Sequence, residues 1–472
     1  MPRPPDPGAL ERLKSAVGAG GWLEAPADIE PFLRDFRGLY RGASPLVLLP
    51  GGVDEVARVL AICNHEDIAV VPHGGNTGYC GAATPDESGT QIVLSLRRLN
   101  RIRRLDAANN SLIIEAGSTL AAAQAAARAA QRLFPLSLGS EGSAQIGGNL
   151  STNAGGTAVL RYGMMRDLVL GLEVVLADGR VMSRLKSLRK DNAGYDVKSL
   201  FVGAEGTLGV ITAASLKLFP LPTDSATALV GVKSPRHALR LFEHLRAAVG
   251  DLITSFELMP RRAVELTVRH IAGVANPLAD AAPWYVLVEI SSAADQGLPA
   301  QLASQLAAAG EAGAIDEAII ATSLAQAAAM WKLRESVPEA QRHHGASLKH
   351  DVSVPISAVP ELIERGAELV RRLVPEGETL AYGHMGDGNL HFNVSRTGPD
   401  SPAFQARRES LQEAIFDLVG ELGGSFSAEH GIGRLKAAEL ARRADPVELS
   451  VMRALKRALD PKGIMNPGKV LA

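Results

Sequence analysis

Residues 146 to 156 of this 472-residue chain read IGGNLSTNAGG, a run without a single charged side chain. The run is too polar and small-sided to form a core, and too apolar to serve as a linker. Glycine lets a backbone come close to a ligand and turn its N–H groups toward it. The run therefore suits close backbone approach to a large, planar ligand that carries phosphate.

This run is part of a longer glycine-rich segment, Gly139–Gly156, and two more such segments flank it in the sequence, Pro72–Gly78 and Gly203–Ile211. Each alone is equally well explained as an ordinary turn, but the three together favour a binding site. No GxGxxG lies between a predicted strand and a predicted helix, so an NAD-binding Rossmann site is unsupported. A near match to a phosphate-binding P-loop, Gly463–Val470, is rejected because Val470 replaces the magnesium-binding hydroxyl.

The composition indicates a globular protein of more than one domain, with 46% hydrophobic and 21% charged residues. A net charge of -2 gives no reason to expect nucleic acid as a partner. The two cysteines, Cys63 and Cys80, form neither a disulfide framework nor a CxxC motif, which suits a reducing cytoplasm. No apolar run approaches the roughly 20 residues of a membrane span, so we expect a soluble, cytoplasmic protein.

Hydrophobic periodicity predicts an α+β fold. In the first half we expect a helix over Val53–Glu66, ending near Asp67, and an alanine-rich helix over Thr119–Leu133 capped by Ser118. Predicted strands there are Pro45–Gly52, Ile68–Pro72, Ile92–Leu96, Ser111–Glu115 and Val169–Ala177, the last entering a hairpin at Asp178-Gly179.

Two prolines within Leu218–Ser225 mark a domain boundary. Beyond it, strands and helices alternate in a βαβ-like rhythm that indicates an α/β sheet domain rather than a helical bundle. The predicted strands are Ala228–Val232, Tyr285–Ile290 and Ala318–Ala321, and the predicted helices are Pro235–Ala248 and Leu298–Glu311.

Two histidines, His384 and His391, are separated by a Gly-Asp-Gly sequence that permits a tight reversal. Such a reversal can bring two imidazoles to one side of a metal ion. A second cluster places Glu429 and His430 side by side between small residues. Single histidines are usually hydrogen-bonded core or surface residues, but two in a glycine-framed turn, with a third beside a glutamate, favour a functional site. Adjacent residues on an extended backbone point in opposite directions, so Glu429 and His430 should have different roles.

Several of these motifs resemble the FAD-binding domain of the vanillyl-alcohol-oxidase flavoprotein superfamily, and the resemblance runs from about Pro45 to the C-terminus. The motifs are PHGGNTG at residues 72–78, IGGN at 146–149, DNAGYD at 191–196 and GTLGVIT at 206–212. The histidine clusters narrow the resemblance to the branch of FAD-dependent D-2-hydroxy acid dehydrogenases that contains the D-2-hydroxyglutarate and D-lactate dehydrogenases.

The resemblance implies a FAD-binding domain over residues 1–222 and an α/β substrate-binding cap domain with the metal-site histidines over 223–425. A C-terminal helical segment over 426–472 would return to the flavin. Cofactor contacts are implied for Pro72, Gly74, Gly75, Asn76, Thr77 and Gly78, then for Gly139, Ser140, Ser143, Ile146, Gly147, Gly148, Asn149, Thr152, Asn153 and Gly155, and finally for Glu205, Gly206, Gly209, Val210, Ile211 and Asn466. Some members attach FAD through a histidine at the place of Asn76, so we expect noncovalent FAD.

The same resemblance implies that His384, His391 and Glu429 bind a divalent metal and that His430 is the catalytic base. Zinc is the favoured metal for two imidazoles and a carboxylate, and manganese or cobalt would also fit. An isolated cation usually lies on a solvated face. By resemblance, however, Arg334 and Lys349 hold the substrate's distal carboxylate, with Asn393 near the reacting end. One departure is Pro338, which stands where members preferring 2-hydroxyglutarate tend to carry threonine.

We therefore expect FAD-dependent, metal-assisted oxidation of a D-2-hydroxy acid to the 2-keto acid. D-2-Hydroxyglutarate is the favoured substrate, with D-malate and D-lactate as a broader range. An electron-transfer flavoprotein or a quinone would accept the electrons, and a homodimer is compatible with the sequence. The alternatives are an enzyme that prefers D-lactate or other monoacids, a zinc hydrolase, and a flavin electron-transfer subunit of a glycolate-oxidase-like complex.

Overall fold

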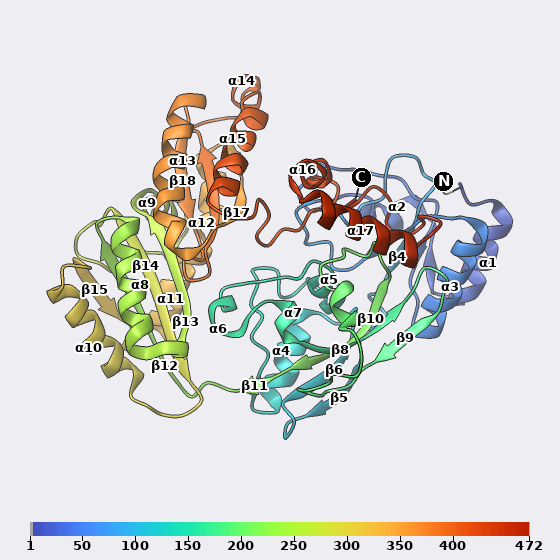
Figure 1. Ribbon diagram of the computed structural model, residues 1–472, viewed down its shortest axis with the longest axis horizontal. Helices are drawn as coiled ribbons and strands as arrows, with labels where there is room; N and C mark the ends of the chain where they lie inside the picture. Colours follow the sequence, from blue (N-terminus) through green and yellow to red (C-terminus); the bar gives the residue numbers. More distant parts are fainter. Residues whose placement is uncertain (1–2, 472) are drawn as a thin grey trace. The chain divides into compact units, whose positions relative to one another are not determined.

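The computed structural model describes residues 3–471, so the outer limits of the predicted domains, 1 and 472, lie outside it. The chain forms two compact units (Figure 1). Unit 1 comprises the described residues up to Gly156, then Gly163–Leu221 and the residues from Glu429 onward. Unit 2 comprises Thr157–Tyr162 and Pro222–Ala428. Unit 2 thus interrupts the sequence of unit 1.

Unit 1 begins with a small sheet in which β2 and β3 run parallel to β4, and β1 pairs antiparallel with β2. Its strands are β1 (Trp22–Leu23), β2 (Val47–Leu48), β3 (Val70–His73) and β4 (Ile92–Ser95), accompanied by helices α1 (Pro7–Val17), α2 (Pro26–Ile29) and α3 (Val53–Glu66). The predicted helix over Val53–Glu66 is confirmed. It ends where Asp67 turns left-handed, at φ 58°.

A five-stranded antiparallel sheet, in the order β5-β6-β10-β8-β9, forms the second part of unit 1. Its strands are β5 (Ile102–Asp106), β6 (Ser111–Glu115), β8 (Val169–Val175), β9 (Val181–Arg184) and β10 (Val210–Lys217), and the short helices α5 (Ile146–Ser151) and α7 (Met165–Leu168) lie between them in the sequence. Helix α6 (Val159–Tyr162), from the same stretch of sequence, belongs to unit 2. The predicted hairpin is confirmed, because β8 pairs with β9 across Asp178-Gly179.

The alanine-rich helix differs from its prediction at both ends. Helix α4 spans Leu120–Ala129, and Thr119 rather than Ser118 is its cap, because the Thr119 side chain accepts a hydrogen bond from Ala122 N. Gln131 then adopts φ 54°, and the chain continues into β7 (Arg132–Leu133), which pairs with β11 (Phe219–Pro220). That pairing, not the local sequence, ends the helix early.

Unit 2 contains a four-stranded sheet in the order β13-β14-β12-β15. Its strands are β12 (Asp224–Val232), β13 (Ile253–Pro260), β14 (Trp284–Ser292) and β15 (Glu317–Ile320), and the helices between and after them are α8 (Pro235–Val249), α9 (Arg261–His270), α10 (Leu298–Glu311), α11 (Leu324–Glu335) and α12 (Val337–His344). The predicted alternation of strands and helices is confirmed. The pairs are all antiparallel, unlike the parallel pairs of a true βαβ unit.

Both faces of this sheet are buried. On β14, Val286 and Val288 belong to one hydrophobic core, which includes residues of α8 and α10. Tyr285 and Leu287 belong to a second core, which includes residues of α9 and α11. Successive strand residues face opposite sides of a sheet, so a strand buried on both faces reads as a continuous hydrophobic run.

A second sheet in unit 2 is built around β19 (Asn389–Ser395), which pairs with β16 (Ser347–Leu348), β17 (Asp351–Ser353) and β18 (Glu378–Tyr382). Helices α13 (Val359–Leu373), α14 (Pro402–Gln405) and α15 (Arg408–Glu421) accompany it. A side chain at Gly366 of α13 would lie 2.5 Å from the Phe392 ring, so only glycine lets this helix approach β19 so closely.

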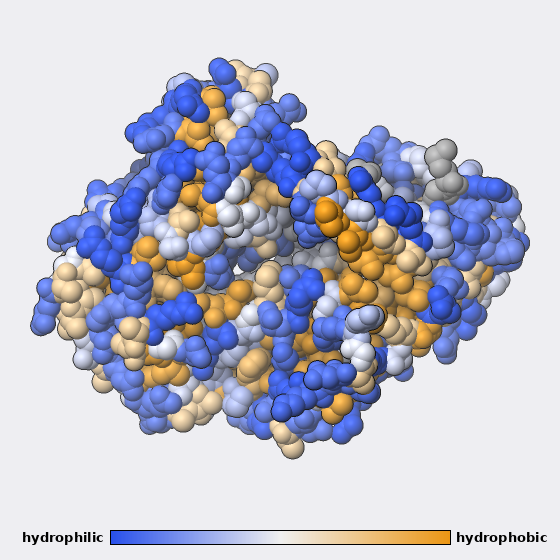
Figure 2. Space-filling model, viewed as in Figure 1, coloured by the Kyte–Doolittle hydropathy of each residue, from blue (hydrophilic) through white to orange (hydrophobic). Residues whose placement is uncertain are grey.

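The C-terminal part of unit 1 contains α16 (Ala437–Arg443) and α17 (Pro446–Leu459), followed by a tail. Lys456 donates hydrogen bonds to the carbonyls of Thr207 and Met465, each at 2.8 Å. The surface of α17 is apolar in part, since Val447 and Val451 are 71% and 54% exposed. An orange area lies over the place of α17 in Figure 2. Within the described residues, none of the helices combines the length and the apolar character needed to span a bilayer.

Candidate flavin pocket and metal-ligating cluster

A pocket in unit 1 is lined by all three glycine-rich segments of the sequence. β3 ends in the first segment, α5 carries the second, and the third leads into β10. The predicted residues that line it are Pro72, Gly74, Gly147, Gly148, Thr152, Glu205, Gly206, Gly209, Val210 and Ile211. Sequence reasoning missed His73, Ala82, Ala83, Leu96, Ala116, Gln145 and Ser151, which also line it.

The glycines in and beside this pocket serve two different purposes. A Cβ at Gly75 would lie 1.9 Å from the Ser143 carbonyl oxygen, and one at Gly147 would lie 2.8 Å from the Ala116 Cβ. These glycines allow the protein to pack against itself. A Cβ at Gly148, by contrast, would meet nothing within 4 Å, although this residue lines the pocket. Gly148 therefore leaves space that a ligand can occupy.

Several buried polar atoms around the pocket have no hydrogen-bond partner within the described chain. They include both ring nitrogens of His73 and Oε1 of Gln145, and both residues line the pocket. Burial lowers the pKa of His73 to about 4, so its imidazole is neutral at pH 7. A buried polar atom without a partner costs free energy, and a polar ligand can supply the missing bonds. The pocket therefore fits a cofactor with both planar and polar parts.

Other predicted cofactor residues use their polar groups within the protein. Asn76 donates a hydrogen bond from Nδ2 to the Arg34 carbonyl at 2.7 Å, and Asn153 accepts one from Arg166 N at 2.9 Å. The Asn466 side chain donates to the carbonyls of Ala82 and Glu205, at 3.0 and 2.7 Å. These contacts hold the segments around the pocket together. The other predicted cofactor residues that do not line the pocket are Gly75, Thr77, Gly78, Gly139, Ser140, Ser143, Ile146, Asn149 and Gly155.

Glu205 links the third glycine-rich segment to the residues that follow His430. Its carboxylate accepts hydrogen bonds from Ile432 N at 2.7 Å and Gly433 N at 2.8 Å. Burial raises the pKa of this carboxyl to about 7. The imidazole of His430 lies 4.5 Å from the Tyr79 ring between centroids. His430 is therefore held next to the first glycine-rich segment.

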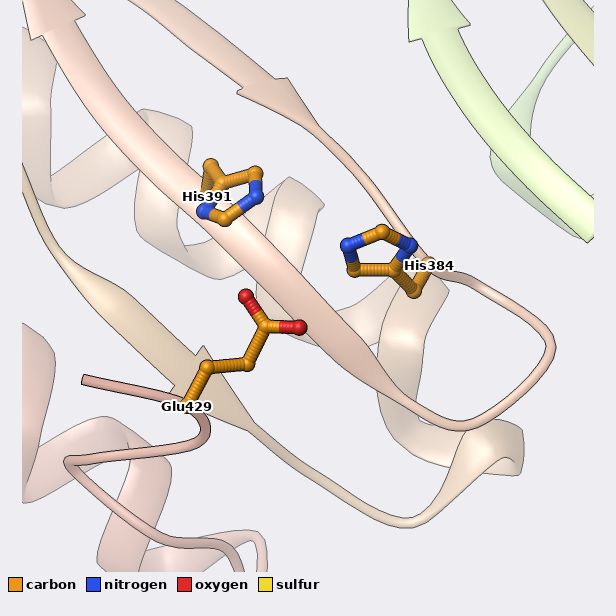
Figure 3. Close-up of side chains that lie close together, drawn as sticks. All are labelled: His384, His391 and Glu429. Atoms are coloured by element: carbon orange, nitrogen blue, oxygen red, sulfur yellow. The ribbon is translucent and has the colours of Figure 1, made fainter. Parts of the chain in front are cut away.

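The histidines of the second motif lie close together in unit 2. β18 and β19 form a hairpin whose turn carries His384, while His391 lies on β19 itself. The centroids of the two imidazole rings are 5.7 Å apart. Glu429, the first residue after unit 2 along the chain, completes the cluster. One ligand atom from each of the three residues lies within 4.8 Å of the others (Figure 3).

The predicted substrate residues have very different surroundings. Arg334, on α11, is only 5% exposed and donates from Nε to Glu257 Oε2 at 2.7 Å. Lys349, between β16 and β17, is exposed. Asn393, on β19, is buried and donates from Nδ2 to Gln341 Oε1 at 2.9 Å. Pro338 lies in the first turn of α12, where a missing N–H costs little.

Sequence reasoning missed Glu257, which contacts both Arg334 and His384. Its Oε1 lies 2.6 Å from His384 Nδ1. The segment ITSFELMP is a buried strand along its whole length, and Glu257 is its single charged residue. A charge in such a strand requires a partner, which is the signal that would have revealed it.

The glycine-framed pocket lies in a mixed α+β chain whose fold is of the vanillyl-alcohol-oxidase type. Two solved structures share this fold. p-Cresol methylhydroxylase with substrate bound has a TM-score of 0.79 at 15% identity, covering 100% of this chain and 98% of that chain. 4-Ethylphenol oxidase from Gulosibacter chungangensis has a TM-score of 0.75 at 17% identity, covering 99% of both.

Sequence comparison defines the family. Residues 44–183 match the FAD binding domain, and residues 221–470 match the C-terminal domain of FAD linked oxidases. A D-2-hydroxyglutarate dehydrogenase of Xanthomonas citri pv. viticola is 36% identical, covering 98% of this chain and 97% of the relative. The mitochondrial D-2-hydroxyglutarate dehydrogenase of Bos taurus is 38% identical, covering 99% and 83%. The chain belongs to this family of FAD-dependent oxidoreductases.

Proposed function

We propose that the protein oxidises a D-2-hydroxy acid to the corresponding 2-keto acid, with D-2-hydroxyglutarate as the preferred substrate. The observation that carries the proposal is the cluster of His384, His391 and Glu429 in a chain with a FAD-binding domain. The relatives named D-2-hydroxyglutarate dehydrogenase, at 34–38% identity, support the choice of substrate.

The donor set of the cluster fits zinc. Two imidazole nitrogens and one carboxylate oxygen are a common zinc ligand set, and they leave coordination positions open for substrate oxygens. When bound, the metal would make the substrate hydroxyl more acidic and FAD would take up the hydride. The same three residues would fix the position of the hydroxyl and carboxylate oxygens.

His430 is the proposed general base. It adjoins the ligand Glu429, so a hydroxyl oxygen held by the cluster would lie near its imidazole. Its ring is held against Tyr79, and the backbone after it is fixed by the Glu205 carboxylate. A base held in this way is positioned before the substrate arrives, and proton transfer to a positioned histidine is effective near neutral pH.

Arg334 and Lys349 are the proposed partners of the distal carboxylate. A diacid offers that carboxylate and a monoacid does not, so the two cations favour D-2-hydroxyglutarate or D-malate over D-lactate. Pro338 removes one hydroxyl donor, and a neutral hydrogen bond contributes only about 0.5–1.5 kcal/mol. We therefore propose a preference for the diacid together with measurable activity on D-lactate.

FAD is proposed to bind without a covalent link. Asn76 holds the place at which some flavoproteins of this class carry an attaching histidine, and its amide bonds to the Arg34 carbonyl instead. Denaturing the purified protein in acid and centrifuging it tests this. Yellow colour in the supernatant is the expected result, and colour that stays with the pellet would overturn it.

The electron acceptor is proposed to be an electron-transfer flavoprotein or a quinone. A specific alternative comes from a relative in Saccharomyces cerevisiae, named D-2-hydroxyglutarate–pyruvate transhydrogenase, which is 35% identical and covers 95% of this chain and 90% of the relative. Stopped-flow reoxidation of the reduced protein by pyruvate, by a soluble quinone and by oxygen distinguishes these acceptors. Rapid reoxidation by pyruvate alone would favour the transhydrogenase.

The experiment that tests the proposed function is anaerobic bleaching of the bound flavin. The protein is mixed with the D and L forms of 2-hydroxyglutarate, malate and lactate, and the flavin absorbance is followed. We expect the D-diacids to bleach fastest and the L-acids to have no effect. Equal bleaching by both enantiomers, or none by any acid, would overturn the proposal.

We also propose a cytoplasmic protein, because both cysteines are buried and form no disulfide. Several relatives are named as mitochondrial proteins. Cell fractionation decides between these locations, and size-exclusion chromatography with light scattering tests the proposed homodimer.

A further inference from the structure

Glu257 is a buried carboxylate in the middle of β13. It is 1% exposed and lies in a strand whose residues are buried from Ile253 to Pro260. Burial of a charge is expensive unless hydrogen bonds and opposite charges compensate for it. Hydrophobic packing does not explain a buried carboxylate at this position, so its hydrogen-bond partners must.

The first contact concerns His384. Its Nδ1 lies 2.6 Å from Glu257 Oε1. An ionised carboxylate can only accept hydrogen bonds, so Nδ1 must carry the proton. In a neutral imidazole the lone pair then lies on Nε2, so this is the nitrogen that can bind a metal ion. Glu257 thus selects one of the two tautomers of His384 and fixes the plane of its ring.

The second contact concerns Arg334. Its Nε donates to the other oxygen of the same carboxylate, Oε2, at 2.7 Å. The guanidinium also lies over the Tyr382 ring, 5.3 Å from its centroid. Within the described chain, Nε is the only atom of the guanidinium that donates a hydrogen bond, so its two Nη groups retain their donors. These are the atoms that could bind a substrate carboxylate in a bidentate manner.

Both contacts keep Glu257 ionised. Burial of this carboxylate is costly, and the hydrogen bonds to His384 and Arg334, at 2.6 and 2.7 Å, compensate for it. Each carboxylate oxygen of Glu257 contacts one partner, so loss of the carboxylate would affect His384 and Arg334 at once.

We propose that Glu257 is a positioning residue that fixes the metal-binding tautomer of His384 and the direction of Arg334 through its two oxygens. This inference rests on the proposed function, in which His384 is a ligand and Arg334 binds the distal carboxylate. It adds a direct connection between metal binding and substrate selection. Glu257 itself would touch neither the metal nor the substrate.

The test compares Glu257→Gln with wild type. A glutamine can accept from only one of the two donors, and its NH2 group opposes the other. Loss of such an outer partner typically costs about 10–100-fold in metal affinity. We expect zinc affinity, measured by chelator competition, to fall by about this factor. The kcat/KM ratio of D-2-hydroxyglutarate to D-lactate should fall as well.

Glu289→Gln is the matched control. Glu289 lies on the neighbouring strand β14 and accepts hydrogen bonds from Trp331 Nε1 at 2.8 Å and Thr227 Oγ1 at 3.2 Å. It contacts neither His384 nor Arg334. The control should leave the zinc affinity and the substrate ratio near their wild-type values. Equal changes in both variants would mean that Glu257 only stabilises the sheet, and unchanged values in Glu257→Gln would also overturn the proposal.

Two further measurements keep the inference separate from the proposed function. If wild-type protein takes up no zinc, the proposed metal role fails, but the tautomer of His384 remains measurable by ¹⁵N NMR. A proton on Nδ1 in wild type that is lost in the variant supports Glu257, and a proton on Nε2 in wild type refutes it. If Glu257→Gln does not fold, Glu257→Asp takes its place. It keeps the charge but shortens the side chain, so zinc affinity should again fall.

Discussion

Two neighbouring glycines of α5 provide a direct test of the flavin pocket, because a methyl group at each would meet different surroundings. At Gly147 it would lie 2.8 Å from the Ala116 Cβ and 3.2 Å from its carbonyl oxygen. Overpacking of this kind costs about 1–3 kcal/mol, which corresponds to a fall in Tm of roughly 2–10 °C for a domain of this size. We therefore expect Gly147→Ala to lower the Tm even without FAD.

At Gly148 the same methyl group would meet no protein atom within 4 Å. Alanine is favoured over glycine in a helix by about 1 kcal/mol, so the Tm of the FAD-free protein should stay the same or rise. The methyl group would occupy ligand space, at a cost of about 1–3 kcal/mol, or roughly 5–150-fold in the Kd for FAD.

The assay is a fluorescence titration of FAD-free protein with FAD, paired with thermal melts of the same samples. Gly148→Ala should raise the Kd without lowering the Tm, and Gly147→Ala should lower the Tm. Wild-type affinity for FAD in Gly148→Ala would show that the cofactor does not occupy this pocket.

The remaining predictions concern catalysis, metal and pH. His430→Ala should lower kcat by about 10²–10⁴-fold with zinc content retained, and a change confined to KM would point to binding instead. Chelation should abolish most turnover while the flavin absorbance stays with the protein, and full activity in protein shown to be metal-free would refute the metal role. Arg334→Ala should reduce kcat/KM for D-2-hydroxyglutarate about 10–150-fold more than for D-lactate, the equivalent of one charge-assisted contact of about 1.5–3 kcal/mol. Because the folded pKa of Glu205, about 7, exceeds its ordinary value of 4.5, the folded protein binds the extra proton between these pH values. The free energy of unfolding of the protein should therefore fall as pH rises from about 4.5 to about 7. In Glu205→Gln, thermal melts over the same pH range should show a smaller fall in Tm.

Local sequence predicted those elements whose ends have local causes. The helix over Val53–Glu66 ends at Asp67, which adopts the left-handed conformation that acidic and amide side chains tolerate better than most. The helix over Leu298–Glu311 has regular apolar spacing, and its prediction is confirmed. By contrast, the end of α4 depends on β7 pairing with β11, a contact with residues far along the chain. No local pattern in an alanine-rich stretch could have predicted it.

The residue types of the site could be predicted from the sequence, but the contacts that orient these residues could not. Glycine-framed motifs revealed the histidines, and the glycine-rich segments revealed most of the pocket lining. The partners that orient these residues come from elsewhere in the sequence. Glu257 lies 127 residues from His384, and Glu205 lies 227 residues from Ile432. Such pairings follow from tertiary structure, and the one local signal in the sequence is the charged Glu257 within an otherwise uncharged strand.

The interrupted sequence of unit 1 has a consequence for how the protein is made. The Asn466 side chain donates to the Ala82 carbonyl, 384 residues earlier in the chain, and Lys456 donates to the Thr207 carbonyl, 249 residues earlier. A nascent chain cannot close these contacts until the whole of Pro222–Ala428 has been translated. Those 207 residues (428 − 222 + 1) take about 10–40 s at the usual 5–20 residues per second. During that time the segments that line the flavin pocket lack the contacts of Lys456 and Asn466, while the inserted unit is free to fold before those contacts form.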